Sequence, residues 1–321
     1  MDVKVRSGTR DDIEALVEVE CSDVEVWHHF SSEGRGAPAS YQELTPSERC
    51  MHGGPWMDAG TLTRYWHHIE RLGIVPLVAE LNGKVVGHLD VIFSSELSLG
   101  SFLYLDVLTI HKAYRRRGVA KSLIKEAERL AKSRKARYML VQPQQYEGPS
   151  GLTYTSCGFK KAFDVYDLEM PVNQSEIPSG VRLVSVPRTQ EAPLDTHAMI
   201  CGWYNIGAKM WDYGVNPDVE LLHAFSAHQL ALSALTNGSV YFLHLGQNFS
   251  DPSTGTLCLW APTPLEKDAL QRVLQAATAT ASWLGMKRLT TKSVERHITT
   301  LEKAGFVLKS RDEPYLAKEL E

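Results

Sequence analysis

The chain has 321 residues, of which 43% are hydrophobic and 22% are charged, and its formal net charge is −4. This length favours two domains over one compact core, and the net negative charge argues against nucleic acid as a partner. A charged start and the lack of an apolar run of about 18 residues lead us to expect neither a signal peptide nor a membrane partner. The five cysteines are scattered without a CxxC pair, so we expect a reducing compartment and a cytoplasmic protein.

The first elements predict a sheet with helices packed on it. Alternating residues predict a strand at 3–6, and Thr9 is the expected N-cap of the next helix. Residues 23–60 are rich in Gly, Pro, Ser, Trp and His, and they predict irregular structure. A second helix is expected from about Thr61 to Gly73, a glycine suited to a helix C-terminus.

Strands then lead to the most basic stretch of the chain. Asn82-Gly83 joins two apolar runs and predicts a type I′ hairpin, and a third strand is expected at 102–110. The segment YRRRGVAKSLI, residues 114–124, continues directly into a helix with one apolar stripe. A short strand, a short helix and a last strand are expected at 137–143, 151–159 and 163–170.

The same order of elements returns after a linker at 171–180. Placing Ala136 on Met286, an offset of 150, aligns the preceding helices, and placing Phe159 on Phe306, an offset of 147, aligns two Gly-Phe pairs. We therefore expect two diverged copies of one domain, at 1–170 and 181–321. The alternative is a chance match between two unrelated α/β domains.

The basic stretch has the features of an anion site. The first amides of a helix have no partner within the helix, and its dipole places partial positive charge there. Gly118 and the small Ala120 allow a ligand to approach the backbone, and Arg115, Arg116 and Arg117 can add charge-assisted hydrogen bonds. A diphosphate fits such a site. The alternative is an ordinary solvated charged face.

Two motifs carry a family resemblance. Arg115-x-x-Gly118-x-Ala120 resembles the acyl-CoA signature Q/R-x-x-G-x-G/A of the GNAT superfamily of N-acetyltransferases. Some 35 residues later, Tyr154, Gly158 and Phe159 are similar to its Y-x-x-x-G-F segment. The resemblance extends in element order from Val3 to about Met170 and more faintly through the second half. It implies an α/β (α+β) fold with two GNAT-like domains, each a mixed, mostly antiparallel central sheet flanked by helices.

The resemblance also implies where acetyl-CoA, the expected co-substrate, would bind. Backbone groups at the end of the third strand would hold the pantetheine arm, the Ile110 amide would polarise the thioester carbonyl, and the amides from Arg116 to Lys121 would hold the pyrophosphate. The implied cofactor-binding residues are Leu108, Thr109, Ile110, Arg115, Arg116, Arg117, Gly118, Val119, Ala120 and Lys121. Two positions depart from the family pattern, with Lys112 in place of a common proline and Glu147 in place of a frequent asparagine.

The implied reaction is direct attack of an amine on acetyl-CoA. An alkyl ammonium must first lose a proton, and the departing thiolate needs one. By the resemblance, Tyr154 is the expected acid, and the alternative is a buried core tyrosine. Asp106 is expected as the base or as the residue that holds a proton-carrying water, or else as an ordinary polar side chain. Tyr104 is a weaker candidate.

Histidines and aromatic residues gather in the irregular segment. Neighbouring histidines point in different directions and no cysteine or carboxylate spacing accompanies them, so we expect no metal site. The aromatic residues form either a wall of the acceptor pocket or simple core packing: Trp27, Phe30, Trp56, Tyr65 and Trp66.

The second copy keeps the packing pattern and lacks the candidate site residues. Arg115, Gly118 and Ala120 correspond to Leu265, Asp268 and Leu270, and Tyr154 corresponds to Leu301. We therefore expect a catalytic first domain and a degenerate second one that completes the acceptor cleft or forms a homodimer surface. The acceptor would be a small-molecule or peptide amine. A non-catalytic acyl-CoA-binding sensor is the alternative function.

Overall fold

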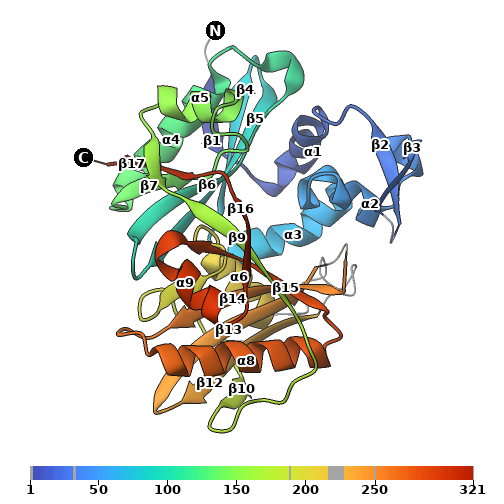
Figure 1. The fold of residues 1–321 in the computed structure, drawn as a ribbon. Helices are drawn as coiled ribbons and strands as arrows, with labels where there is room; N and C mark the ends of the chain where they lie inside the picture. Colours follow the sequence, from blue (N-terminus) through green and yellow to red (C-terminus); the bar gives the residue numbers. More distant parts are fainter. Residues whose placement is uncertain (1–2, 32–33, 188, 216–227, 249–250, 321) are drawn as a thin grey trace. The chain divides into compact units, whose positions relative to one another are not determined.

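The computed structural model describes residues 3–31, 34–187, 189–215, 228–248 and 251–320. It divides the chain into two compact units, and each contains a mostly antiparallel sheet with helices packed on it (Figure 1). The first unit comprises Met1–Phe93, Phe102–Lys160 and Leu316–Glu321, and the second comprises Ser94–Ser101 and Lys161–Tyr315. The predicted fold class is confirmed.

The first unit is built on a seven-stranded sheet. Its strands, in spatial order, are β1 (Lys4–Ser7), β4 (Val75–Leu81), β5 (Lys84–Glu96), β6 (Gly100–Ile110), β7 (Tyr138–Val141), β17 (Tyr315–Glu319) and β8 (Lys160–Phe163). β6 and β7 are parallel, whereas β1–β4, β4–β5 and β7–β17 are antiparallel. Asn82 (φ 53°) and Gly83 (φ 78°) are both left-handed, as the predicted type I′ turn requires.

The helices of the first unit are α1 (Ile13–Cys21), α2 (Pro46–Met51), α3 (Ala59–Arg71), α4 (Val119–Ser133) and α5 (Pro149–Ser156). α4 buries a stripe at helical spacing in the same cluster as the sheet residues, consisting of Val119, Leu123, Ile124, Ala127 and Ala131. A Cβ on Gly87 of β5 would lie 2.8 Å from Ile110 Cδ1 and 2.9 Å from Val119 Cγ1. Gly87 therefore lets the start of α4 and the end of β6 pack directly on β5.

The expectation of irregular structure at 23–60 is wrong in part. This segment contains a two-stranded hairpin, β2 (Trp27–Ser31) and β3 (Gly34–Ala39), and then α2. Two capping boxes order the residues after this hairpin, since Glu43 accepts from the Ser40 amide and Glu48 accepts from the Thr45 amide. The pattern Ser/Thr-x-x-Glu occurs twice within residues 23–60, and it signals helical turns even in a segment rich in Gly and Pro.

The second unit is built on an eight-stranded sheet. Along its main path the strands are β10 (Arg182–Ser185), β12 (Gln229–Thr236), β13 (Ser239–Gln247), β14 (Thr254–Ala261), β15 (Arg288–Val294), β9 (Val165–Pro171) and β16 (Val307–Arg311), and β11 (Ala198–Cys201) pairs with β14. β14 and β15 are parallel. The described helices are α6 (Gly207–Val215), α8 (Lys267–Trp283) and α9 (Glu295–Lys303).

The helices of the two units correspond as the repeat predicts. Shifting α4 by 150 residues gives 269–283, which lies within α8 at 267–283. Shifting α5 by 147 residues gives 296–303, which lies within α9 at 295–303. Gly158 (φ 91°) and Gly305 (φ 102°) share a left-handed conformation, which explains why both copies keep the Gly-Phe pair.

The last strand of each copy lies in the sheet of the other. β9 pairs with β15 and β16 of the second sheet, and β17 pairs with β7 of the first (Figure 1). Shifting β9 by 147 residues gives 312–318, which overlaps β17 at 315–319, so the two strands occupy equivalent positions in the repeat. The compact units therefore differ from the two sequence copies expected at 1–170 and 181–321, because the last strand of each copy pairs in the sheet of the other. The sequence repeat could not reveal that β9 and β17 exchange sheets, because both strands have the same position in the repeat.

Candidate functional site

A free strand edge in the first unit forms one side of the candidate site. β6 pairs with β7 from Phe102↔Tyr138 to Tyr104↔Leu140, after which β7 ends at Val141 while β6 continues to Ile110. Among the described residues, no other strand takes the place beside this part of β6. The stretch that contains Leu108, Thr109 and Ile110 is half-buried, so its backbone groups are available to an extended ligand.

The arginine turn connects this strand to α4. Arg116 (φ 63°) and Gly118 (φ 82°) are left-handed, and Gly118 is the N-cap of α4. A glycine cap supplies no side chain for the first amides of the helix, and a Cβ on Gly118 would meet no atom within 4 Å. Left-handed residues in such turns direct neighbouring amides to one side. The result is an uncapped, solvent-open helix N-terminus suited to an anion.

Arg115 holds the turn in place. Its Nε donates to the Ile110 carbonyl at 3.2 Å, and its guanidinium forms an ion pair with Asp23. The Lys112 amide donates to Ser22 Oγ at 3.0 Å, so the segment after α1 also anchors the turn. The departure at Lys112 therefore leaves the turn ordered. Arg115 is already bonded within the protein, whereas Arg116 and Arg117 are exposed.

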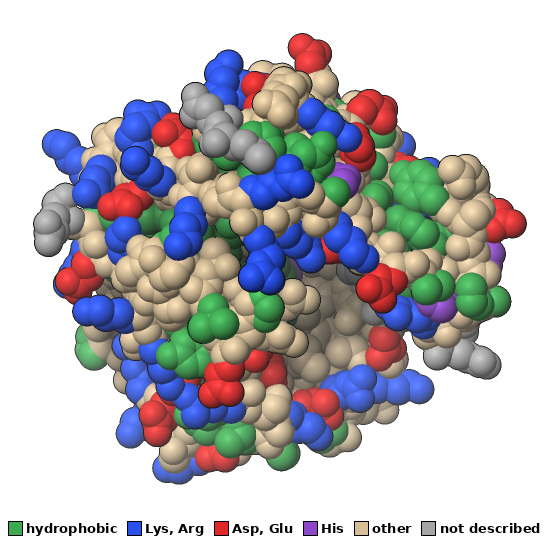
Figure 2. Space-filling view, turned by 90° about the horizontal axis from the view of Figure 1, so that it is seen from above, with side chains coloured by type: hydrophobic (Ala, Val, Ile, Leu, Met, Phe, Trp, Pro, Cys, Tyr) green, Lys and Arg blue, Asp and Glu red, His purple; other side chains and the backbone are tan. Residues whose placement is uncertain are grey.

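Positive charge gathers locally on this chain of net charge −4. Figure 2 shows several Lys and Arg side chains close together near the middle of one face. Arg115, Arg116, Arg117 and Lys121 are all exposed, while Val119 is buried beneath the helix start and Ala120 is half-buried. The predicted cofactor residues thus comprise an exposed basic turn on an apolar support.

Tyr154 lies in the core of the first unit, in the buried cluster against which Leu108 and Ile110 pack. Its side chain is 5% exposed and its ring meets Phe159 edge-on, with centroids 5.6 Å apart. Burial raises the pKa of Tyr154, and electrostatic interactions with Cys157 and Asp106 raise it further. The phenol is therefore protonated at neutral pH, which is the form that can donate. The influence of Asp106 on this pKa brings the two predicted catalytic residues into one neighbourhood.

Strict alternation does not fix the direction of Asp106. Leu105 and Leu108 are three residues apart, yet both pack against the same buried cluster. The alternation of side chains between the two faces of β6 is therefore interrupted between Leu105 and Leu108. For this reason, the even spacing between Asp106 and Ile110 does not show that their side chains lie on the same face. The electrostatic link to Tyr154 is the observation that relates Asp106 to the site.

Glu147 lies just before α5, the helix that carries Tyr154. It is exposed, and its neighbour Gly148 is the N-cap of α5. A Cβ on Gly151 would lie 1.8 Å from the Tyr146 carbonyl oxygen, so the first turn of α5 packs tightly on the preceding backbone. The second departure from the family pattern therefore leaves α5, and with it Tyr154, in position.

The five aromatic residues expected to form an acceptor wall or core packing divide into two groups. Trp56, Tyr65 and Trp66 are buried, which identifies them as core packing. Trp27 and Phe30 are half-buried and lie edge-on to the ring of His52, with centroids 4.6 and 5.0 Å away. Of these five residues, Trp27 and Phe30 present aromatic surface from which an acceptor wall could be made.

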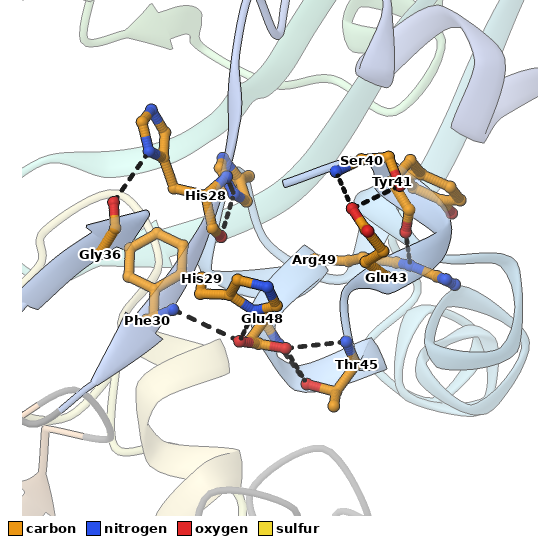
Figure 3. Close-up of polar contacts among 11 residues, drawn as sticks. His28, His29, Phe30, Gly36, Ser40, Tyr41, Glu43, Thr45, Glu48 and Arg49 are labelled. Carbon is orange, nitrogen blue, oxygen red and sulfur yellow. Dashed lines mark hydrogen bonds and ion pairs between the residues drawn. The ribbon is translucent and has the colours of Figure 1, made fainter. Parts of the chain in front are cut away.

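The histidines beside them serve the local structure (Figure 3). His29 Nδ1 lies 2.9 Å from Glu48 Oε1, and His28 Nδ1 lies 3.1 Å from the Gly36 carbonyl. Hydrogen bonds from the Thr45 backbone, His29 and the Thr45 side chain lower the pKa of Glu48 to about 2. Within the described ranges, no group of three or more His, Cys, Asp or Glu residues is arranged to hold a metal ion.

A buried charged cluster in the first unit was missed by the sequence analysis. His88 Nδ1 lies 2.8 Å from Glu20 Oε1, and His88 Nε2 lies 2.8 Å from Asp90 Oδ1. Carboxylates only accept, so both ring nitrogens donate and His88 is an imidazolium. The spacing His88-x-Asp90 on one face of a strand was the available signal, but Glu20 comes from α1, 68 residues earlier.

The corresponding strand edge in the second unit is filled. β14 and β15 pair only from Thr254↔Arg288 to Thr256↔Thr290. Beyond that point β11 pairs with β14, with Met199 opposite Trp260, while β13 occupies the other edge of β14. The Gly202 amide donates to the Lys292 carbonyl at 2.8 Å, which joins the end of β11 to β15. Thus β11 takes the place that is open beside β6.

Comparisons with known proteins agree with this architecture. Residues 41–159 match the Acetyltransferase (GNAT) family. No match was found among the curated proteins. Among the described helices, none is long and apolar enough to cross a membrane.

Solved structures similar to this chain include three GNAT proteins. The tandem GNAT protein from the clavulanic acid biosynthesis pathway, solved without AcCoA, aligns with a TM-score of 0.51 and 13% identity over 100% of this chain and 99% of that chain. A GCN5-related N-acetyltransferase from Anabaena variabilis aligns with a TM-score of 0.57 and 13% identity, over 100% of this chain and 73% of that chain. A GCN5-related N-acetyltransferase from Sphaerobacter thermophilus aligns with a TM-score of 0.50 and 16% identity, over 99% of this chain and 96% of that chain.

At these identities the solved structures define the fold alone, and the family match covers the part of the chain that contains α4 and α5. Residues 41–159 thus match the GNAT family, and the two sheet–helix units of the chain share the fold of solved GNAT proteins. The matched family is one of acetyltransferases.

Proposed function

We propose that this protein is an acetyl-CoA-dependent N-acetyltransferase whose first unit is catalytic. The observation that carries the proposal is the junction of an open strand edge, which ends at Ile110, with the uncapped N-terminus of α4 at Gly118. An extended amide-bearing arm would add to the edge of β6, and its diphosphate would lie on the α4 amides beside Arg116 and Arg117. These two features together match the pantetheine arm and the diphosphate of acetyl-CoA.

The chemistry requires a base, an oxyanion donor and an acid. The amine nitrogen attacks the thioester carbonyl carbon, the carbon–sulfur bond breaks, and the products are an amide and the CoA thiol. Asp106, directly or through a water, would take the proton that the attacking amine loses. The Ile110 amide would stabilise the oxyanion, and Tyr154 would give its proton to the leaving sulfur.

The acceptor is a small-molecule or peptide amine. Trp27, Phe30 and His52 supply a half-buried aromatic surface in the first unit on which an amine-bearing group could pack. The second unit does not repeat the reaction in this proposal. Leu301 takes the position of Tyr154, and β11 occupies the strand edge that the cofactor arm would need.

A transfer assay with a panel of amines tests the proposal. Purified full-length protein would be incubated with acetyl-CoA and each amine, and CoA and acetylated product would be quantified by chromatography with mass detection. Acetyl transfer to at least one amine class, lost in Tyr154→Phe, is the expected result. Tight acetyl-CoA binding without transfer or hydrolysis across the panel would instead favour an acyl-CoA-binding sensor.

A further inference from the structure

The second unit contains a cavity of about 560 Å³ between α8 and α9. Its volume lies in the range of small-molecule sites. The lining comes from the start of α8 and from α9, and consists of Leu265, Lys267, Asp268, Gln271, Leu274, Arg296, His297, Thr299, Thr300 and Lys303. All of these residues belong to the second unit, and the proposed acetyltransferase site uses none of them.

The charge of the cavity is positive. Lys267, Arg296 and Lys303 face a single carboxylate, Asp268, which leaves a formal charge of +2 in the lining. Burial, with Arg296 nearby, lowers the pKa of His297 to about 4, so that ring is neutral at pH 7. Across the described parts of the chain, neither Lys267 nor Lys303 forms an ion pair. Their charges are therefore available to a ligand.

Hydrogen-bond donors accompany these charges. The N-cap of α8 is Glu266, whose side chain makes no capping hydrogen bond, so no N-cap side chain satisfies the first amides of this 17-residue helix. Thr299, Thr300 and Gln271 add side-chain donors on the walls. Several donors around a net positive charge suit a tetrahedral, multiply charged oxyanion better than a planar carboxylate.

The fold limits the shape of the ligand. This cavity corresponds in the repeat to the region of α4 and α5, but β11 fills the strand edge that is open in the first unit. A pantetheine arm therefore has no edge to pair with. Asp268 corresponds to Gly118, so the approach to the backbone is narrower than at the arginine turn, and the Lys and Arg side chains supply most of the contacts to the ligand.

We propose that the cavity between α8 and α9 is a second ligand site, which binds a compact phosphate-bearing anion that lacks a pantetheine arm. Lys303 and Arg296 on α9 and Lys267 on α8 supply its charge. Arg296 also donates to Ser98 Oγ at 2.7 Å, and the Ser98 amide donates to Glu96 Oε2 at 2.8 Å. The site is thereby bonded to the loop that joins β5 to β6.

Calorimetric titration of the full-length protein with inorganic pyrophosphate tests the proposal. Gly118→Glu serves as the background, because it removes the proposed diphosphate site of the first unit. In this background we expect one equivalent of pyrophosphate to bind, and Lys303→Ala to weaken binding by about tenfold, the effect of losing one close charge pair. Lys309→Ala on β16 is the control, since Lys309 is outside the cavity, and it should leave the affinity unchanged.

Three results would overturn the proposal. One is the absence of pyrophosphate binding at millimolar concentration. Another is binding that Lys303→Ala and Arg296→Ala leave intact. The third is citrate binding as tightly as pyrophosphate, which would exclude selectivity for phosphate. None of these readouts depends on acetyl transfer, so failure of the proposed function and failure of this site are distinguishable.

Discussion

Met199 on β11 pairs with Trp260 on β14, along the edge of β14 that β15 has left. The side chains of Met199, Ile200 and Cys201 are at most 2% exposed, so this short strand is an integral part of the second core. We therefore predict one acetyl-CoA per chain, bound by the first unit. Native mass spectrometry near the dissociation constant gives the count directly. Two equivalents would show that the second unit also binds the cofactor.

A single glycine substitution in the arginine turn tests the proposed cofactor site. Gly118→Glu should abolish acetyl-CoA binding and leave the fold intact, because it places a carboxylate over the α4 amides where nothing lies within 4 Å. Gly285→Glu is a matched control: Gly118 has φ 82°, Gly285 has φ 80°, and a Cβ on Gly285 likewise meets no atom. Both variants carry the same strain of roughly 1–2 kcal/mol. Equal loss of affinity in the two would refute the anion site.

If Tyr154 is the general acid, its replacement should lower turnover and leave acetyl-CoA binding intact. Tyr154→Phe keeps the edge-on contact with Phe159 and should leave acetyl-CoA affinity within a few-fold. Turnover should fall by about 10²-fold, the usual scale for a general acid. Tyr241→Phe, at a fully buried tyrosine of the second unit, is the control and should leave turnover unchanged. Undiminished turnover in Tyr154→Phe would make that tyrosine structural.

The exchanged strands predict the behaviour of fragments. A fragment ending at Met170 lacks β17, which lies between β7 and β8, and leaves β9 without its partners. We expect this fragment to be unfolded by circular dichroism. Residues 3–163 joined through a flexible linker to residues 314–320 restore the first sheet and should fold and bind acetyl-CoA. A folded, cofactor-binding 1–170 fragment would contradict the strand exchange.

The buried His88 cluster predicts a decline in stability at alkaline pH. Burial alone would lower the pKa of His88, but Asp90 and Glu20 outweigh it and raise that pKa to about 10. Because this folded-state value exceeds the ordinary value of about 6.5, the stabilisation is complete below pH 6.5 and is lost as pH rises to about 10. Urea unfolding across this interval should show a falling free energy of unfolding.

Asp90→Asn provides the comparison for this pH dependence. It removes one of the two charges that hold the proton on His88, so the decline should become shallower. His297→Gln is the control, because the pKa of His297 is lowered to about 4 and that ring does not titrate in the interval. Parallel curves for Asp90→Asn and the unchanged protein would exclude the cluster as the cause.

The sequence by itself determined the local elements. The Asn82-Gly83 turn, the stripe of α4 after Gly118 and the Gly-Phe pairs at Phe159 and Phe306 all lie in the structure where the patterns place them. Each depends on residues close together in the chain, whose spacing and backbone preferences are visible in the sequence. The arginine turn was found in the same way, since its glycine, its charges and its helix are contiguous.

Only the tertiary structure decided which strand entered which sheet and which edge remained open. β9 and β17 carry equivalent patterns, so the choice between the two sheets depends on packing against distant strands. The same is true of β11, whose four residues close an edge of β14 some 60 residues later, and of Glu20, which reaches His88 from α1. Long-range pairing leaves no local periodicity, and it decides which strand edge is open to a ligand and which is filled.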